Sequence, residues 1–160
     1  EFYWFEEKRL LLRRLVNRQQ RLMSTLATNT FITNKNLYSI VPKEGCSPEL
    51  LLGLLNSKLI SHLYIHQVSQ ATKDDFPQVT IKDVLSLPFP SRTIQSAAHD
   101  KLVALVEKML ALHQQLAAAK TPQDTTLLQR QIDATDKQID QLVYQLYGLT
   151  DEEIALVEGA

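Results

Sequence analysis

The sequence has one cysteine, four glycines and no long apolar run, and each shortage excludes a class of protein. Cys46 has no second cysteine with which to form an internal disulfide, so we expect a reducing, cytoplasmic location. No run of about 18 consecutive apolar residues exists, and therefore no membrane-spanning helix is predicted. The glycines are too scattered for a phosphate-binding loop. An apolar fraction of 44% indicates a folded protein rather than a disordered one.

The sequence also lacks a recognisable catalytic motif. His62 and His66 lie four residues apart and could share a metal, but no cysteine or carboxylate supports them, so ordinary packing is the preferred interpretation. Glu6-Glu7-Lys8 matches part of a nuclease motif without the preceding aspartate. We therefore predict that this chain is not itself an enzyme and binds no cofactor. With no initiator methionine, it is expected to be a piece of a longer protein.

Acidic residues are missing from one part of the chain. Residues 1–90 hold 11 Lys and Arg against 8 Asp and Glu, a balance of +3, whereas residues 91–160 hold 6 against 10, a balance of −4. Residues 8–35 contain seven basic residues and no acidic one. Such a run favours a polyanion, because each phosphate contact releases counterions. A solvated basic face without a specific partner is an equally open interpretation.

The first third of the chain predicts short strands. Leu10-Leu11-Leu12 is typical of a buried strand that leads into a basic turn, although residues 5–23 could also form a basic helix. Residues 22–29 and 31–41 are predicted to pair as an antiparallel hairpin. We expect two to four strands in total.

A strongly apolar helix is predicted next. Ser47 is the expected N-cap, Pro48 occupies the first helical position, and Glu49 suits the positive end of the helix dipole. The polar triplet Asn56-Ser57-Lys58 lies near the middle of this helix. We interpret Asn56 as a helix-breaking cap or a buried amide bonded to backbone rather than as a ligand contact.

Two prolines in residues 85–90 predict an extended exit and a domain boundary. Beyond it, apolar residues follow steps of three and four in two runs, which predicts an antiparallel coiled-coil hairpin. The break between the helices falls at Thr121 and Pro122, Gly148 closes the second helix, and Thr150 begins a short last helix. The runs are Leu102, Leu105, Met109, Leu112 and Leu116, then Leu128, Ile132, Thr135, Ile139, Leu142 and Leu146.

The predicted fold class is therefore α+β. Residues 1–90 should form a small mixed domain with a few short strands around a buried helix. Residues 91–160 should form the helical hairpin, acting as a spacer, with a short C-terminal helix.

Several segments in order carry a resemblance to a known family. FITNKNLYSIVP, then LLNSKLI, then LSLPFP resembles the C-terminal specificity domain of TaqI-like adenine DNA methyltransferases and of fused type II restriction–modification enzymes. The ending IDQLVYQLYGLTDEEIALVEG is similar to the tail that follows this domain, and the resemblance covers about residues 9–160. Type I specificity subunits share the scheme of a recognition domain followed by spacer helices.

The resemblance implies a target recognition domain that binds double-stranded DNA. The parent protein would bind S-adenosylmethionine and transfer a methyl group to adenine N6, with a nuclease centre possible elsewhere in it. The catalytic Asn/Asp-Pro-Pro-Tyr/Phe motif of such methyltransferases has no match in this chain. The methyltransferase domain of the same protein is the expected protein partner.

Residue type alone selects the candidate DNA contacts, because recognition loops vary within the family. Phosphate contacts are assigned to basic side chains, and base-edge contacts to arginines and amides, since Arg pairs with guanine and Asn or Gln with adenine. The phosphate candidates are Arg9, Arg14, Lys35 and Lys73. The base-edge candidates are Arg13, Arg18, Gln19, Gln20, Arg21, Asn34 and Asn36. We expect residues 13–21 to be the main reading segment.

A docking module is the alternative function. In that case the helical hairpin would bind another subunit or a second copy of itself, and the basic segment would only be solvated. A salt titration of duplex binding separates the two functions, because phosphate contacts make affinity fall steeply with salt.

Overall fold

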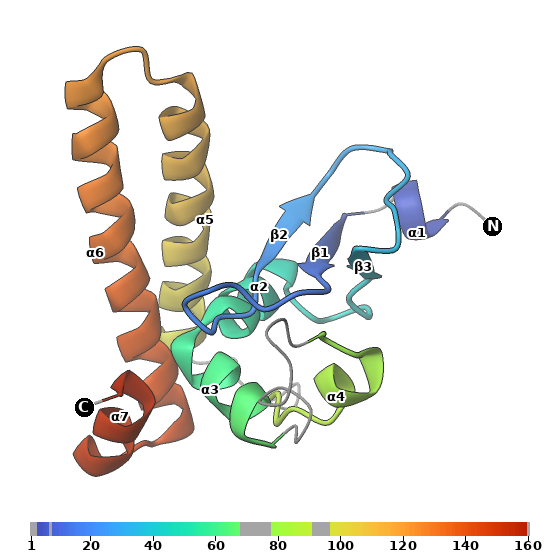
Figure 1. The fold of residues 1–160 in the computed structure, drawn as a ribbon, viewed down its shortest axis with the longest axis vertical. Helices are drawn as coiled ribbons and strands as arrows, with labels where there is room; N and C mark the ends of the chain where they lie inside the picture. The colour runs from blue at the N-terminus through green and yellow to red at the C-terminus, as the bar shows by residue number, and fades with distance from the viewer. Residues whose placement is uncertain (1–2, 7, 68–77, 91–96, 160) are drawn as a thin grey trace.

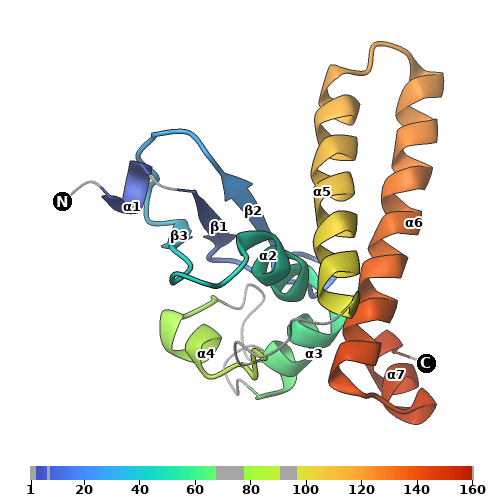
Figure 2. The same ribbon diagram turned by 180° about the vertical axis from the view of Figure 1, so that it is seen from behind.

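The computed structural model describes residues 3–6, 8–67, 78–90 and 97–159. A small sheet with short helices stands beside a long helical hairpin (Figures 1 and 2). The elements are α1 (Tyr3–Glu6), β1 (Arg9–Arg13), β2 (Ser24–Ala27), β3 (Leu37–Ile40), α2 (Pro48–Asn56), α3 (Lys58–Gln67), α4 (Ile81–Leu85), α5 (Ala97–Ala118), α6 (Pro122–Tyr147) and α7 (Asp151–Glu158). The predicted α+β class is confirmed. None of the described helices has both the length and the apolar content needed to cross a membrane.

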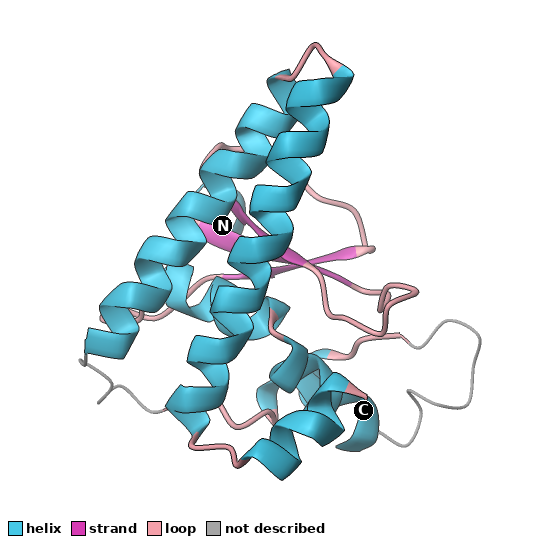
Figure 3. Cartoon of the chain, turned by 90° about the vertical axis from the view of Figure 1, so that its left-hand side faces the viewer, coloured by secondary structure: helices cyan, strands magenta, loops and turns pink. Residues whose placement is uncertain are grey.

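The three strands form one antiparallel sheet in the order β2-β1-β3, seen nearly edge-on in Figure 3. The predicted hairpin between residues 22–29 and 31–41 is wrong, because β1 lies between those strands and pairs with both. The reason lies in burial. Residues 9–12 of β1 are buried, so β1 occupies the centre, and the more exposed β2 and β3 become the edges.

Helix α2 begins as the sequence predicts. Ser47 accepts a hydrogen bond from the backbone N–H of Leu50, and Pro48 is in the first turn. The helix does not continue through the polar triplet, however, because Ser57 is extended, with ψ of 154°. The buried Ser57 hydroxyl donates to the carbonyl of Leu54 (2.7 Å) and accepts from the N–H of Ile60 (3.2 Å), so it terminates one helix and starts the next.

The long hairpin also follows its local signals. Thr121 caps α6 by accepting from the N–H of Asp124, and Gly148 ends α6 in the left-handed region with φ of 67°. Thr150 and Glu153 form the predicted capping box of α7. Helices α5 and α6 pack along their length, which confirms the helical hairpin and the short helix after it.

One hydrophobic cluster spans the sheet, the short helices and the hairpin. Leu10 and Leu12 point from β1 towards α2, and the opposite side of α2 packs on α5. Gly53 marks a close approach of α2 to α5, because a Cβ placed on it would lie 2.8 Å from Cγ2 of Val106. The hairpin is therefore fixed to the sheet through α2 rather than suspended from a linker.

Candidate nucleic-acid interface

The chain between β1 and β2, residues 14–23, is here called the basic loop. Its turn is organised by Asn17, whose side-chain oxygen accepts from the backbone N–H groups of Gln19 (3.0 Å) and Arg21 (2.8 Å). The backbone N–H of Asn17 donates to the carbonyl of Arg21 (3.1 Å), and Gln20 takes a left-handed φ of 58°. The loop is thus ordered by its own backbone before any ligand binds.

The side chains of Arg18, Gln19 and Gln20 form the tip of the basic loop. All three residues are exposed, and their side chains make no hydrogen bond or ion pair with any described residue. Because Asn17 holds the backbone beneath them, the tip presents one guanidinium and two amides from a fixed base. These are the groups that pair with guanine and adenine edges.

A second polar turn lies beside the start of the basic loop. The register pairs Arg13 with Leu37, and the backbone N–H of Arg14 donates to the carbonyl of Asn36 (2.9 Å). Asn34 orders this turn by accepting from the N–H of Asn36 (3.0 Å), leaving Lys35 exposed. The sheet therefore brings residues 34–36 to the same end as the basic loop.

Arg13 and Arg14, at the end of β1, differ in exposure and in their contacts. Arg13 is exposed, and its Nη1 lies 3.4 Å from Sδ of Met23. Arg14 is half-buried, and its Nη2 donates to Oε1 of Gln78 (2.9 Å). Both still carry positive charge to the edge of this surface.

Arg9, a predicted phosphate contact, is the first residue of β1, at the opposite end of that strand from the basic loop, and is fully buried. Its guanidinium donates to the carbonyls of Asn29 (3.1 Å) and Phe31 (2.9 Å) and stacks 4.7 Å above the Phe31 ring. The side chain thereby fastens the β2–β3 connection across the sheet. Because Arg9 is buried, it is not among the DNA contacts proposed below.

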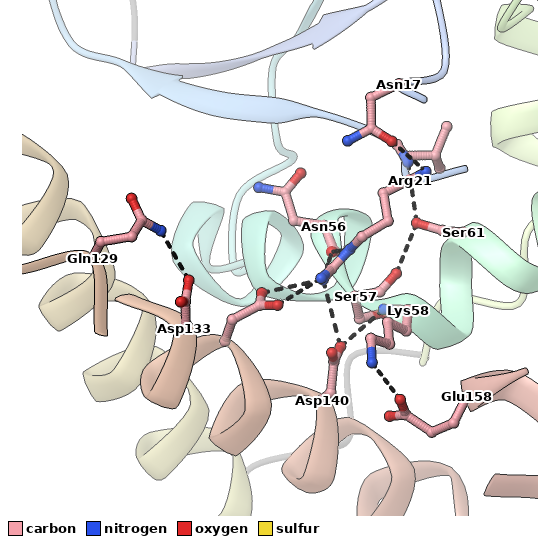
Figure 4. Close-up of polar contacts among 12 residues, drawn as sticks. Asn17, Arg21, Asn56, Ser57, Lys58, Ser61, Gln129, Asp133, Asp140 and Glu158 are labelled. Atoms are coloured by element: carbon pink, nitrogen blue, oxygen red, sulfur yellow. Dashed lines mark hydrogen bonds and ion pairs between the residues drawn. The ribbon is translucent and has the colours of Figure 1, made fainter. Parts of the chain in front are cut away.

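Arg21, a predicted base contact, points away from the tip and into the protein (Figure 4). Its Nη1 donates to Oδ2 of Asp136 (2.6 Å), and its Nη2 lies 3.2 Å from Oδ1 of the same residue and 3.6 Å from Asp140. It also donates to the carbonyl of Asn56. Arg21 therefore joins the basic loop to α6. Lys73 lies outside the described residues.

Asn56 behaves as an amide bonded to backbone, as the sequence interpretation holds. Its Oδ1 accepts from the N–H of Ser24 (2.7 Å), and its Nδ2 donates to the carbonyl of Ser24 (2.9 Å). The side chain thus pairs with the edge of β2 as a neighbouring strand would. This interaction fixes the end of the basic loop against α2.

Asp140 is the most strongly perturbed carboxyl group near the basic loop. Its Oδ1 accepts from the backbone N–H of Lys58 (2.8 Å), and only 2% of its side chain is exposed. Burial raises the pKa of Asp140 to about 6, even though the bond from Lys58 and the charge of Arg21 oppose that shift. At neutral pH the carboxylate is ionised and completes the charge pairing of Arg21.

Sequence reasoning missed Asn17, Asp136 and Asp140 as residues that shape this surface. Asn17 carries a usable signal, because asparagine between a strand and a turn commonly bonds to the backbone two residues later. The two aspartates are spaced four apart on α6, but nothing in the sequence links them to Arg21, 115 residues before Asp136.

The described residues contain no group of three or more side chains suited to hold a metal. His62 and His66 do lie together, with ring centroids 4.2 Å apart. Burial and the neighbouring His66 lower the pKa of His62. Histidines packed on each other without further ligands fit the packing interpretation.

Comparison with known proteins identifies the chain. The TaqI-like C-terminal specificity domain family matches residues 1–89. A protein of Methanocaldococcus jannaschii, named as a type II restriction enzyme and methyltransferase, is 40% identical over 83 residues. That match covers 51% of this chain and 7% of the relative's length. The chain belongs to the family of TaqI-like C-terminal specificity domains.

Proposed function

We propose that this chain reads the DNA sequence for a restriction–modification enzyme. Its contact surface consists of the tip of the basic loop together with the polar turn at residues 34–36. The proposed contacts are Arg13, Arg14, Arg18, Gln19, Gln20, Asn34, Lys35 and Asn36, with Lys73 retained from its charge alone. Membership of a specificity-domain family supports this function.

One observation carries the proposal: the tip is exposed, and the side chain of Asn17 is hydrogen-bonded to the backbone of the loop that bears it. Arg18 can approach a guanine edge, and Gln19 or Gln20 an adenine edge, without the loop first having to fold. Lys35 is exposed at the same end of the sheet and supplies a positive charge for the phosphate backbone. The acidic hairpin is unsuited to lie along DNA, and we assign it the role of a spacer.

The parent protein, on this proposal, is an adenine-N6 DNA methyltransferase that uses S-adenosylmethionine, and it could also contain a nuclease. Both activities would reside outside this chain, which lacks the methyltransferase motif. No step of that chemistry is assigned to the residues described above. Their role is to bind a duplex and orient it for the catalytic domain.

The test uses the full-length parent and duplexes selected from a randomised library. Arg18→Ala is expected to weaken binding to the selected site by roughly ten- to a hundredfold and to relax one base position, because a bidentate base contact is worth about 1–3 kcal/mol. Lys35→Ala should weaken all duplexes alike and reduce the salt slope by about 0.9.

Arg130→Ala is the matched control, because Arg130 is an exposed basic residue near the distal end of the hairpin. It should leave affinity and base preference unchanged. Equal effects of Arg18→Ala and Arg130→Ala would contradict the proposed surface. Absence of duplex binding by the parent at low salt would favour the alternative, a docking function of the hairpin.

A further inference from the structure

Arg21 stands where the basic loop, the α2–α3 junction and the hairpin meet (Figure 4). It contacts the carbonyl of Asn56, which closes α2, and the carboxylates of Asp136 and Asp140 on α6. The tip of the basic loop, residues 18–20, ends one residue before it. Three separate parts of the chain therefore set the position of one side chain at the base of the tip.

The backbone beside Arg21 is anchored to the same junction. The N–H of Leu22 donates to Oγ of Ser61 (3.1 Å), and that hydroxyl donates to the carbonyl of Ser57 (2.8 Å). The N–H of Lys58 is bonded to Asp140. The loop consequently cannot tilt towards or away from α6 without breaking these contacts together.

The low exposure and the ion pairs of Arg21 favour an indirect role of this residue in DNA binding over a direct contact. Only 17% of the Arg21 side chain is exposed, against 36% for Asp136 and 2% for Asp140. Two carboxylates already share its guanidinium, and a third anion would have to displace them. The Asp136 side chain is nevertheless exposed enough to be substituted without disrupting the hydrophobic core.

We propose that Arg21 and Asp136 are positioning residues for DNA reading: their ion pair fixes the angle between the tip of the basic loop and the hairpin. This inference rests on the function proposed above. It assigns base discrimination partly to a residue on α6, outside residues 1–89, where the family match lies. The hairpin then contributes to specificity without touching DNA.

The experiment compares site discrimination with overall affinity in the full-length parent. Asp136→Asn, Asp136→Glu and Arg21→Lys are measured against the library-selected duplex and its single-base variants. Asp133→Asn is the matched control, because Asp133 is an exposed aspartate on the same helix whose carboxylate accepts from Gln129 (2.8 Å) and forms no ion pair with a described residue. The thermal unfolding midpoint of every variant is recorded alongside.

Asp136→Asn should reduce the ratio of affinities for selected and mismatched duplexes by about tenfold. A loss of that size corresponds to the discrimination that one of the weaker bidentate base contacts provides. Its salt slope should not change, since no phosphate contact is lost. Asp136→Glu keeps the carboxylate and should retain more discrimination than Asp136→Asn. Arg21→Lys keeps the charge but loses the two-pronged geometry, and should also reduce discrimination.

Simple electrostatics predicts the opposite result for Asp136→Asn. Removing a negative charge would tighten binding to every duplex and leave discrimination intact. For the control Asp133→Asn, such a general tightening is the largest effect that we expect. Tighter binding with unchanged discrimination in Asp136→Asn would overturn the positioning role. A salt slope reduced by about 0.9 in the uncharged variant Arg21→Met would overturn it as well, because it would show that Arg21 contacts a phosphate. A wild-type parent that does not discriminate between duplexes would overturn the proposed function itself.

Discussion

Asp140 makes folding stability depend on pH in an unusual direction. Burial raises its pKa from 3.8 to about 6 in the folded chain. The folded protein therefore binds more protons than the unfolded chain between these values, and the contribution of Asp140 to stability is lost as pH rises from about 4 through about 6. A shift of this size corresponds to roughly 2–3 kcal/mol.

Asp140→Asn tests this contribution. Asparagine keeps the oxygen that accepts from the N–H of Lys58 but does not ionise. The difference in unfolding free energy between wild type and variant, from urea titrations, should shift in favour of the variant by about 2 kcal/mol between pH 4 and pH 7. A pH-independent difference would show that Asp140 does not titrate in this range.

Residue roles that depend on near neighbours were predictable, and those that depend on distant partners were not. Ser47, Thr121 and Thr150 cap helices as expected, because a capping side chain bonds within three residues of itself. The sequence analysis predicts Arg9 and Arg21 as DNA contacts from residue type alone. Their actual partners are carbonyls and carboxylates from other elements, and no spacing in the sequence encodes those meetings.

At the scale of elements, the contact between α2 and α5 depends on a missing side chain. Gly53 lets the helices approach so closely that an added Cβ would lie 2.8 Å from Cγ2 of Val106 and 3.4 Å from Cδ1 of Leu102. Valine is branched at Cβ and cannot easily rotate away. The pairing of α2 with the hairpin is therefore sensitive to a single methyl group.

Gly53→Ala should destabilise the chain by about 1 kcal/mol, because overpacking of about 1–3 kcal/mol outweighs a helix-propensity gain of about 1 kcal/mol. In a Val106→Ala background the same substitution should become neutral or stabilising, since the clash is gone. Urea unfolding of the four chains in this cycle measures the coupling. Equal effects of Gly53→Ala in both backgrounds would contradict the close contact.

The error in predicting the elements has a physical cause. The order of the strands was misjudged because β2 and β3 have suitable sequences for a hairpin, and only the burial of β1 on both sides decides that it lies between them. For the segment around Ser57 the sequence leaves a helix-breaking cap at Asn56 as one of two interpretations, and the structure does end α2 at Asn56. There the N–H of Lys58 bonds to Asp140 instead of continuing the helix.

At the scale of the whole molecule, the sheet and the hairpin share one hydrophobic cluster. Leu52 and Leu55 on α2 belong to it together with Leu102, Val106 and Val143 on the hairpin. The sequence predicts the hairpin as a spacer that follows the mixed domain, and no local pattern indicates that the hairpin also packs on α2. The packing makes it part of the core on which the sheet rests.

A chain of residues 1–90 alone should consequently fail to unfold cooperatively. Removal of the hairpin exposes the face of α2 that packs on α5 and leaves Arg21 without its carboxylates. Far-ultraviolet circular dichroism during heating should show a broad, non-sigmoidal loss of signal, while residues 1–160 melt in one transition. A sharp transition of the short chain near that of the long one would contradict this dependence.

The bonds of Asn17 have a consequence for the evolution and engineering of this domain. They hold the backbone around residues 18–20, whose side chains are exposed and make no hydrogen bond or ion pair with any described residue. Those three positions can therefore be exchanged for other side chains without repacking the protein, apart from the left-handed conformation at Gln20, which suits asparagine, aspartate or glycine. If the tip reads DNA as proposed above, a change of recognised site would require only a few substitutions at these three positions.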